Sequence, residues 1–362
     1  MQKILYAVLA IIALVIIFIV YENRISHQNV RIGLISPLTG LTVGNDNLGQ
    51  GFLNGAILAK EEFESKNPSA PKMDLIAEDD GYDSKKGLSA YQKEVSIDKI
   101  DALINLSSPT IDVIKSDVQK KDIPVLQLGA ESEIDKDNIV QIFPDQTAVG
   151  MLGDSANTQG VKTVTVVMQQ IKAYEKFLSD FEKKFNGTVS IVRVPMTERD
   201  FNPVALKIKE LNSQGLVMFV DGKVGGQILT RMDQLGYHAP HLYFDLNLQF
   251  SFTDYQTTLG SSMNRILNGS TAMYSASEVS ADFTNKYKKR FNSDPSELAG
   301  YGYDAYLVMA ETYNPDKSRW LNNIEKFKGD GATGPIAFDE LGMGLRVPEW
   351  KMATYENGDF KI

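Results

Sequence analysis

RIGLIS at Arg31–Ser36 and MDLIAED at Met73–Asp79 are two strand-like runs, separated by a helical pattern over residues 49–64. Both runs are rich in β-branched and apolar residues, which is typical of strands buried in a sheet. The segment between them repeats its apolar residues with helical spacing. Strand, helix and strand in this order predict a βαβ unit, in which the two strands lie parallel.

The same alternation continues along the chain and predicts two α/β halves. In the first half we expect further strands at 101–106 and 124–128, with helices at 85–96 and 110–121. In the second half we expect strands at 163–168, 188–194, 215–220 and 241–244, with helices at 174–185, 201–214 and 225–236. Such alternation predicts mostly parallel sheets. We interpret residues 140–145 as a crossover between the halves.

The pattern changes after residue 270. Helical patterns at 279–291, 300–313 and 318–328 follow without long strands between them, and residues 350–360 are typical of a terminal hairpin. We therefore expect the chain to return to the first half and to finish on the second. The expected domains are an anchor and tether (1–29), a first lobe (30–145 plus 272–328) and a second lobe (146–271 plus 329–362). Hinges are expected near 143–147, 270–275 and 327–334.

Composition excludes several classes of protein. The chain has 362 residues, of which 43% are hydrophobic, so it is long enough for two packed domains. Its net charge of −9 argues against a nucleic-acid partner, which would require a basic face. The chain has no cysteine, which excludes disulfides, thiolate metal sites, cysteine nucleophiles and a lipid-modified cysteine anchor.

Residues 4–20 form a run of 17 residues without a charge (ILYAVLAIIALVIIFIV). This length is at the low end of a membrane-spanning helix and above the usual core of a cleavable signal peptide. We expect an uncleaved single-pass anchor, with a cleaved signal peptide as the alternative. Lys3 before the run favours a cytoplasmic N-terminus, so the remaining chain is expected on the extracytoplasmic face. Residues 21–29 are polar and could act as a tether.

No catalytic or cofactor motif is evident in the sequence. It contains no dinucleotide-binding glycine pattern after a strand, no phosphate-binding loop and no serine nucleophile elbow. His238 and His241 flank a Pro-containing segment, which favours a surface turn over a metal site. We therefore expect no enzyme, no cofactor and no metal.

The candidate ligand site lies after the strands, because ligands of open α/β sheets bind beyond their carboxyl ends. After the third strand, Ser107, Ser108 and Thr110 open a helix, and a second small-residue loop, Gly129–Ser132, follows the fourth. Helix capping by one hydroxyl is the simpler interpretation of the serines. The two loops together could also receive a carboxylate with hydroxyl and backbone N–H groups.

Two acids follow strands of the second half. Asp221 and Asp245 each stand at the end of an apolar strand, where an acid is usually a turn or cap residue. Together, opposite the serine loops, they would form a cleft with donors on one wall and carboxylates on the other. Such a cleft suits a zwitterion, whose ammonium group needs an acidic partner.

The ordered set of motifs resembles the leucine/isoleucine/valine-binding family of extracytoplasmic solute-binding proteins. The resemblance extends in the right order from about Val30 to the end, and the stretches that carry it are IGLISPLTG (32–40), GQGFLNGAILAKEEF (49–63), EDDGYDSKKG (78–87), LSSPT (106–110), GAES (129–132), IFPD (142–145), GYGYDAY (300–306) and GPIAFDELG (334–342). The resemblance implies the type I periplasmic-binding fold: two Rossmann-like lobes joined by three hinge crossovers. It also implies that an amino acid or related small solute binds between the lobes and is presented to the permease subunits of an ABC transporter.

The resemblance also implies roles for individual residues. The loop at Ser107, Ser108 and Thr110, together with Ala130 and Ser132, resembles the site for the ligand's α-carboxylate. Asp245 stands where the family often places the partner of the α-amino group. Leu48 and Tyr174 resemble residues that line the pocket, and Asp221 falls where an aromatic residue is common.

Three departures from the family pattern bear on the ligand. Pro109 stands in the serine loop, Glu175 and Lys176 follow Tyr174 in place of a glycine turn, and Asp221 adds a second acid. They argue against a plain branched-chain amino acid. A polar, amide-bearing or cationic solute is the alternative.

Two functions of other classes are compatible with the residues. A ligand-sensing ectodomain could use the same fold to signal through a separate membrane partner. A hydrolase could use Asp221 and Asp245 as acid and base with a water molecule. No nucleophile or histidine stands near these acids in the sequence, which disfavours the hydrolase.

Overall fold

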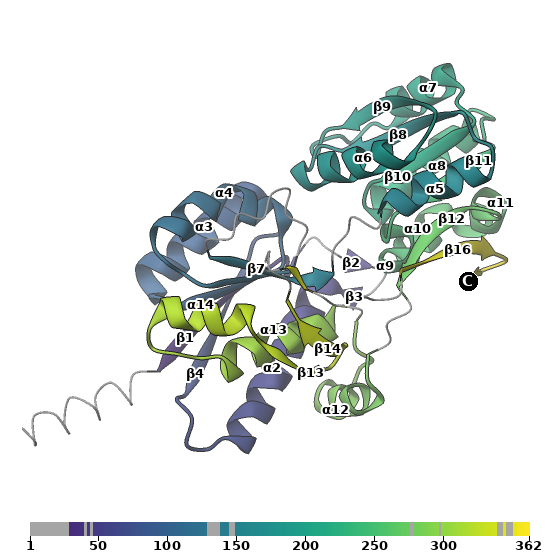
Figure 1. Cartoon of the computed structure of the whole chain (residues 1–362). Helices are drawn as coiled ribbons and strands as arrows, with labels where there is room; N and C mark the ends of the chain where they lie inside the picture. The colour runs from purple at the N-terminus through teal and green to yellow at the C-terminus, as the bar shows by residue number, and fades with distance from the viewer. Residues whose placement is uncertain are drawn as a thin grey trace, which may run out of the picture.

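The computed structural model describes residues 29–39, 42–43, 46–128, 138–144, 149–275, 279–296, 298–338, 343–344 and 350–362. Figure 1 shows two α/β lobes, and its colours show that each lobe contains segments from distant parts of the chain. The expected anchor at 4–20 lies outside the described residues. Among the helices of the described part, none is both long enough and apolar enough to cross a membrane.

A six-stranded sheet forms the first lobe, in the order β15-β7-β6-β5-β1-β4. Every neighbouring pair in this sheet is parallel. The strands are β1 (Val30–Ser36), β4 (Met73–Asp79), β5 (Ala102–Asn105), β6 (Val125–Gln127), β7 (Ile139–Pro144) and β15 (Met343–Gly344). The parallel pairing of β1 with β4 confirms the predicted βαβ unit.

The helices of the first lobe come from both halves of the sequence: α2 (Leu48–Lys66), α3 (Ser84–Lys93) with the π-helical turn η1 (Glu94–Asp98), α4 (Ser108–Lys120), α12 (Ala281–Phe291), α13 (Ala299–Glu311) and α14 (Lys317–Glu325). Helices α2 and α13 pack closely because glycines face the neighbouring backbone. An added Cβ at Gly55 would lie 1.8 Å from the carbonyl oxygen of Ala299, and one at Gly302 would lie 1.9 Å from that of Phe52. The chain therefore returns to the first lobe, as predicted.

A seven-stranded sheet forms the second lobe, in the order β17-β16-β12-β11-β10-β8-β9. Its strands are β8 (Thr163–Gln169), β9 (Thr188–Val194), β10 (Gly215–Phe219), β11 (His241–Phe244), β12 (Thr271–Ser275), β16 (Trp350–Glu356) and β17 (Asp359–Lys361). The pairs formed among β8, β9, β10, β11 and β12 are all parallel, whereas β16 is antiparallel to both β12 and β17. Asn357 and Gly358 have positive φ angles, which an Asn-Gly hairpin turn requires, so the predicted terminal hairpin is confirmed.

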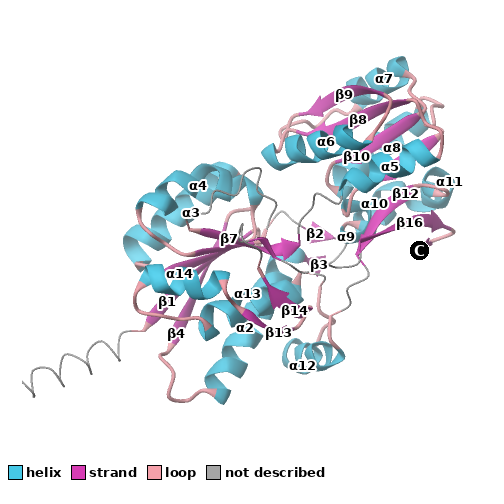
Figure 2. Cartoon of the chain, viewed as in Figure 1, coloured by secondary structure: helices cyan, strands magenta, loops and turns pink. Residues whose placement is uncertain are grey.

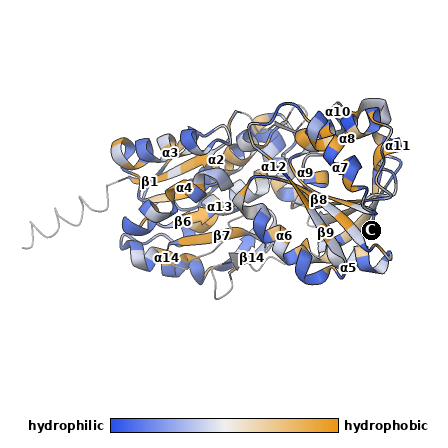
Figure 3. Ribbon diagram, turned by 90° about the horizontal axis from the view of Figure 1, so that it is seen from above, coloured by the Kyte–Doolittle hydropathy of each residue, from blue (hydrophilic) through white to orange (hydrophobic). Residues whose placement is uncertain are grey.

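Helices flank the second sheet as well: α5 (Gly150–Thr158), α6 (Lys172–Lys184), α7 (Asn202–Leu211), α8 (Gly222–Gln234), α9 (Asn247–Phe250), α10 (Phe252–Leu259), the short 3-10 turn η3 (Gly260–Ser262) and α11 (Met263–Leu267). In each lobe the sheet lies between layers of helices (Figure 2). Apolar strands run inside and polar helix faces point outward (Figure 3). The central strand β10 is buried along its whole length, which explains its continuous apolar sequence.

One expected crossover is a strand. Residues 140–145 were predicted to connect the halves, but 139–144 form β7, which pairs in parallel with β6. A short apolar run between two folded halves has the same local pattern whether it is a connection or a strand of the sheet. Because β7 belongs to the first sheet and α5 to the second lobe, the chain first crosses between the lobes between residues 144 and 150.

The strand pairings also differ from two expected lobe boundaries. β12 belongs to the second sheet, so the chain returns to the first lobe after residue 275. Residues 329–342 were expected in the second lobe. Instead β13 (Lys328–Gly331) and β14 (Gly334–Ala337) form a hairpin against α13, and β15 pairs with β7 of the first sheet. The third crossing thus lies between residues 344 and 350.

Buried Asp304 explains why that hairpin stays with the first lobe. Its carboxylate accepts hydrogen bonds from the backbone N–H of Ala332 and from the N–H and hydroxyl of Thr333. A buried carboxylate needs such donors, and the turn of the hairpin supplies them. This long-range contact is not visible in the local pattern of the sequence.

Candidate functional site

Asp221 and Asp245 follow adjacent parallel strands of the second lobe, β10 and β11. Asp221 caps α8, because its Oδ1 accepts a hydrogen bond from the backbone N–H of Val224 at 2.9 Å. Its Oδ2 accepts a second hydrogen bond, from Nε2 of Gln169 at 2.8 Å. The cap interpretation is therefore confirmed, and each carboxylate oxygen retains capacity for another donor.

Asp245 is more deeply placed than Asp221, with 3% of its surface exposed. Its two oxygens accept hydrogen bonds from the backbone N–H and the side-chain amide of Asn247, each at 2.9 Å. Burial raises the pKa of Asp245 to about 7, and the bonds from Asn247 offset only part of that effect. Asp245 is thus a buried carboxyl group whose described hydrogen-bond donors are neutral.

Tyr174 adjoins Asp245 through a shared neighbour. Its hydroxyl accepts a hydrogen bond from Nδ2 of Asn247 at 3.1 Å, and its ring lies 6.3 Å from that of Phe219 in a stacked orientation. Burial raises the pKa of Tyr174, and the carboxylate of Asp245 raises it further. The predicted pocket aromatic and the predicted ammonium partner therefore belong to one polar cluster.

Tyr255, on α10, was not predicted but belongs to the same region. Its side chain is fully buried, and its hydroxyl has no hydrogen-bond partner among the described residues. Burial raises its pKa, as do the carboxylates of Asp245 and Asp221. The hydroxyl reaches the first turns of α8 because Gly225 has no side chain; an added Cβ there would lie 2.2 Å from it. Helical spacing within 252–259 contains no signal for this role.

Ser107 stands at the start of α4 in the first lobe, in an extended backbone conformation typical of a cap residue. Its side chain makes no capping hydrogen bond, and its hydroxyl is buried without a partner in the described part of the chain. Its carbonyl oxygen accepts a hydrogen bond from Nδ2 of Asn105 at 2.7 Å. The simple capping interpretation thus fails for this hydroxyl, which is left available.

The other two predicted hydroxyls of this loop have partners within the first lobe. The Thr110 hydroxyl donates to Oδ2 of Asp80, and both residues are fully buried. Ser108 forms a side-chain hydrogen bond with Tyr82. These two hydroxyls therefore support the turn at residues 80–83.

Tyr82 occupies a strained position in that turn. The N–H of Asp83 donates to the carbonyl oxygen of Asp80 at 3.0 Å, and the two central residues, Gly81 and Tyr82, have φ angles of 53° and 58°. The left-handed region is ordinary for glycine but unfavourable for a tyrosine. The carboxylates of Asp79 and Asp80 stabilise the turn by accepting hydrogen bonds from the N–H groups of Gly81 and Tyr82. A strained residue held in this way is a candidate for function.

The Tyr82 side chain approaches the second lobe. Burial raises the pKa of its phenol, and the carboxylate of Asp221 raises it further. Tyr82 also contributes to the raised pKa of Tyr174, whose own first cause is burial. We define the interlobe site as Tyr82, Ser107 and Ser108 of the first lobe with Tyr174, Asp221 and Asp245 of the second. The sequence signal for Tyr82 is the Asp-Gly pair in EDDGYD, which is typical of a turn.

The remaining predicted residues surround or lie outside this set. Leu48 is buried at the start of α2, directly after the cap residue Asn47. Ala130 and Ser132 lie outside the described residues, so their part in binding a carboxylate stays a prediction. β2 (Thr42–Val43) pairs with β3 (Asp46–Asn47), and β2 contacts α10 of the second lobe.

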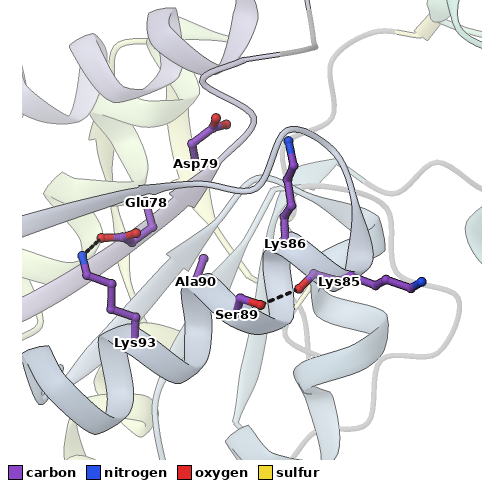
Figure 4. A pocket seen from close by; sticks show the side chains of 7 residues that line it. All are labelled: Glu78, Asp79, Lys85, Lys86, Ser89, Ala90 and Lys93. Carbon is purple, nitrogen blue, oxygen red and sulfur yellow. Dashed lines mark hydrogen bonds and ion pairs between the residues drawn. The ribbon is translucent and has the colours of Figure 1, made fainter.

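A separate hollow of about 420 Å³ lies on the first lobe (Figure 4). It is lined by Glu78, Asp79, Lys85, Lys86, Ser89, Ala90 and Lys93. Lys93 forms an ion pair with Glu78 across it, and the Ser89 hydroxyl donates to the carbonyl oxygen of Lys85. The hollow contains no predicted site residue. It adjoins the Tyr82 turn through Asp79, which accepts a hydrogen bond from Gly81, and through Lys86, which lies beside Gly81.

The two predicted turn histidines lie in separate contacts. Nε2 of His238 is 3.5 Å from Oδ1 of Asp233, whereas the ring of His241 stacks on Tyr243 at 6.3 Å. Within the described ranges, no group of three or more His, Asp or Glu side chains is arranged to hold a metal ion.

Two α/β lobes with three crossings, and with side chains of both lobes meeting between them, define the type I periplasmic-binding fold. The family model described as "Periplasmic binding protein" matches residues 29–341, and the chain belongs to this family. Its members are solute-binding proteins, as the resemblance in the sequence implied. No curated protein matches the chain in sequence.

Solved structures share this fold. The leucine-binding protein LivK of Thermotoga maritima has a TM-score of 0.75 and 19% identity, over 92% of this chain and 98% of that one. LivJ of Streptococcus pneumoniae, solved in complex with isoleucine, has a TM-score of 0.73 and 15% identity, over 92% and 98%. An ABC-transporter solute-binding protein of R. palustris, solved with benzoate, has a TM-score of 0.73 and 15% identity, over 92% and 95%. At these identities the likeness establishes the fold and leaves the ligand of this chain open.

Proposed function

We propose that this protein is an extracytoplasmic solute-binding protein that captures an amino acid or a related small polar solute between its lobes and delivers it to an ABC permease. Membership of the periplasmic binding protein family supports the class of function. The similar fold of LivJ, which was solved with isoleucine, supports the class of solute. The observation that carries the proposal is the environment of Asp245.

Asp245 suits an ammonium group. The carboxyl is 3% exposed, and the donors described around it are neutral: two groups of Asn247 and its own backbone N–H. A buried carboxylate without a cation is unfavourable, and a cationic partner stabilises its charged form. We propose that the ammonium group of the solute is that partner.

The first lobe suits the opposite end of a zwitterion. Ser107 presents a buried hydroxyl, without a partner among the described residues, at the N-terminus of the 13-residue helix α4. Helix N-termini attract carboxylates through their free N–H groups and the helix dipole. We propose that Ser107, with Ala130 and Ser132, contacts the solute's carboxylate, while Leu48 and Tyr174 line the pocket. Ser108 and Thr110 then act indirectly, through Tyr82 and Asp80.

Closure of the lobes is the proposed response to the solute. The two bodies would be residues 29–144 with 279–344, and residues 149–275 with 350–362, and the crossings between them would act as hinges. A solute that contacts both walls stabilises the closed form in proportion to its higher affinity for that form. The permease would recognise the closed form.

Attachment to the membrane is a further part of the proposal. The uncharged run at 4–20 would form a single-pass anchor, and residues 21–29 a tether. The test is to fractionate cells and sequence the N-terminus of the recovered protein. Recovery in the membrane fraction with Met1 or Gln2 at the N-terminus is expected. Soluble protein that begins near residue 25 would show that the segment is a cleaved signal peptide.

The binding proposal is tested by thermal unfolding of the purified full chain with the twenty amino acids, small amides, polyamines and sugars. A ligand at 100 times its Kd adds about 2.7 kcal/mol to the free energy of unfolding, which raises the midpoint measurably. We expect amines or amino acids to raise it. A shift only with sugars would contradict the ammonium assignment.

Calorimetry of Asp245→Asn then tests the residue. We expect the free energy of binding of the amine found in the screen to weaken by about 2–5 kcal/mol, because the buried ammonium loses its ionic partner. Asp154→Asn, an exposed acid on α5 of the same lobe, is the matched control and should bind like the wild type. Equal affinities of Asp245→Asn and wild type would refute the role of Asp245.

A further inference from the structure

The second wall of the interlobe site holds two carboxylates in one region. Asp221 and Asp245 follow neighbouring parallel strands. Both act on the phenols of Tyr174 and Tyr255, so the two acids share the same surroundings. A solute that binds there meets two acidic groups. Asp245 is the proposed partner of its ammonium group, and Asp221 is the second acid.

The donors described around both acids are neutral. Asp221 accepts from the amide of Gln169 and the N–H of Val224. Asp245 accepts from the backbone N–H and side-chain amide of Asn247 and from its own backbone N–H. Among the described residues, no ion pair includes either acid, whereas surface acids such as Asp233 pair with an arginine. The wall therefore carries negative charge that its described part does not neutralise.

Tyr255 is a second and independent sign of a missing partner. Its hydroxyl is buried beside the first turns of α8, close to both acids, and has no hydrogen-bond partner in the described part of the chain. A buried hydroxyl without a partner is unfavourable. An N–H donor from a solute seated between the acids could satisfy the oxygen of this hydroxyl.

Aromatic rings border the same place. Tyr82 comes from the first lobe toward Asp221, and Tyr174 lies beside Asp245 within the second. Aromatic faces next to carboxylates favour organic cations over neutral groups, through the negative face of the ring. The chain's net charge of −9 also favours the approach of cations.

We propose that the solute carries two cationic groups, one paired with Asp245 and the second paired with Asp221 beneath Tyr82. A basic amino acid and an alkyl diamine share this chemistry. The inference rests on the proposed solute-binding function and names its substrate class. A solute with one ammonium group would leave Asp221 without its cation.

The test is calorimetry of the full chain with three compounds of matched length. Lysine carries both cations and a carboxylate, norleucine lacks the second cation, and 1,5-diaminopentane lacks the carboxylate. We expect lysine or the diamine to bind about 10- to 100-fold more tightly than norleucine, the usual effect of a charged hydrogen bond. A higher affinity for lysine than for the diamine would identify an amino acid as the solute. A higher affinity for the diamine would identify a diamine.

Asp221→Asn is the matching variant, because asparagine is also a good helix cap and keeps α8 intact. We expect it to abolish most of the preference for lysine or the diamine while norleucine binds as before. Asp316→Asn, at the cap of α14 in the first lobe, is the control and should keep the preference. If Asp221→Asn unfolds at a lower temperature, Asp221→Ser provides a second variant that can cap the helix.

The outcomes separate this inference from the proposed function. If norleucine or leucine binds as tightly as lysine and the diamine, the inference of a second cationic group is overturned. The proposed solute-binding function then remains intact. An unchanged preference in Asp221→Asn would overturn the role of Asp221. No binding of any amine or amino acid would overturn both proposals.

Discussion

The phenol of Tyr82, on a left-handed turn of the first lobe, lies close enough to the Asp221 carboxylate of the second lobe for that charge to raise its pKa beyond the effect of burial. The two residues are far apart in sequence and belong to different lobes. Their approach brings the wall with the serine hydroxyls and the wall with the carboxylates together. Any solute at this place contacts both lobes, which is the condition for ligand-driven closure.

Tyr82 tests how much strain the turn stores. Tyr82→Gly and Tyr82→Ala both remove the ring, but only alanine keeps a Cβ that is unfavourable at a φ of 58°. We expect the glycine variant to be more stable than the alanine variant by about 1 kcal/mol, measured by urea unfolding. Equal stabilities would mean that the turn relaxes to another conformation when the ring is absent.

Asp245 makes binding of an ammonium solute depend on pH. Burial holds the pKa of Asp245 at about 7 in the unliganded protein, and only the ionised form attracts a cation. We therefore expect affinity to fall about tenfold per pH unit below pH 7 and to be constant above it. Calorimetry between pH 5 and 8.5 measures this, with Asp245→Asn as a control without the transition. The same wild-type affinity at pH 5.5 and pH 8 would contradict the assignment.

The ionisation of Asp245 should also make the stability of the unliganded protein depend on pH, and the direction of this dependence is defined. The folded-state pKa of about 7 exceeds the ordinary value of 3.8, so Asp245 favours the folded state below pH 4 relative to pH 7. Its ionisation destabilises the fold progressively as pH rises through this window. The free energy of unfolding of Asp245→Asn, relative to that of the wild type, should therefore rise by up to about 4 kcal/mol between pH 4 and pH 8. Urea unfolding across this range checks the slope, and a constant difference would disprove it.

Thr110 supports the Tyr82 turn through Asp80. Thr110→Val keeps the shape of the side chain but removes the donor to a fully buried carboxylate. We expect a loss of about 1–3 kcal/mol in the free energy of unfolding, the usual effect of an unsatisfied buried acceptor. Thr158→Val on α5, whose hydroxyl bond is exposed, should change stability by less than about 0.5 kcal/mol. A Thr110→Val effect as small as this control would show that the bond is replaced by water.

Asp304 provides a test of the third crossing. Asp304→Asn loses the charged acceptor of the bonds from Ala332 and Thr333, so we expect a loss of about 3 kcal/mol and faster proteolysis within residues 328–337. Asp330→Asn, an exposed residue in the same hairpin, is the control. If both variants resist protease like the wild type, the hairpin does not depend on its contact with the first lobe.

Local sequence was sufficient where one pattern implies one structure. The strands Met73–Asp79, Thr188–Val194 and His241–Phe244 were predicted with the bounds that the structure has. Each is a β-branched or aromatic run between turn residues, and such runs bury well in a sheet. The positions of Asp221 and Asp245 followed from the same pattern, because both acids come directly after such runs.

Local sequence failed where several structures share one pattern. Residues 139–144 form a strand inside the first sheet although residues 140–145 were interpreted as a connection, and residues 328–344 joined the first lobe although their order suggested the second. In both cases a distant segment decides the outcome: β6 for the first, and the carboxylate of Asp304 for the second.

By itself the sequence determined the α/β class, the return of the chain to its first half and the acids at the strand ends, because these depend on periodicity and on residues next to one another. Only the tertiary structure decided that the Thr110 hydroxyl donates to Asp80, that the Ser107 hydroxyl is buried without a partner in the described ranges, and that Tyr82 approaches Asp221. The physical reason is that burial and hydrogen-bond pairing are properties of groups brought together by folding. A side chain's neighbours along the chain do not reveal which partner it will meet.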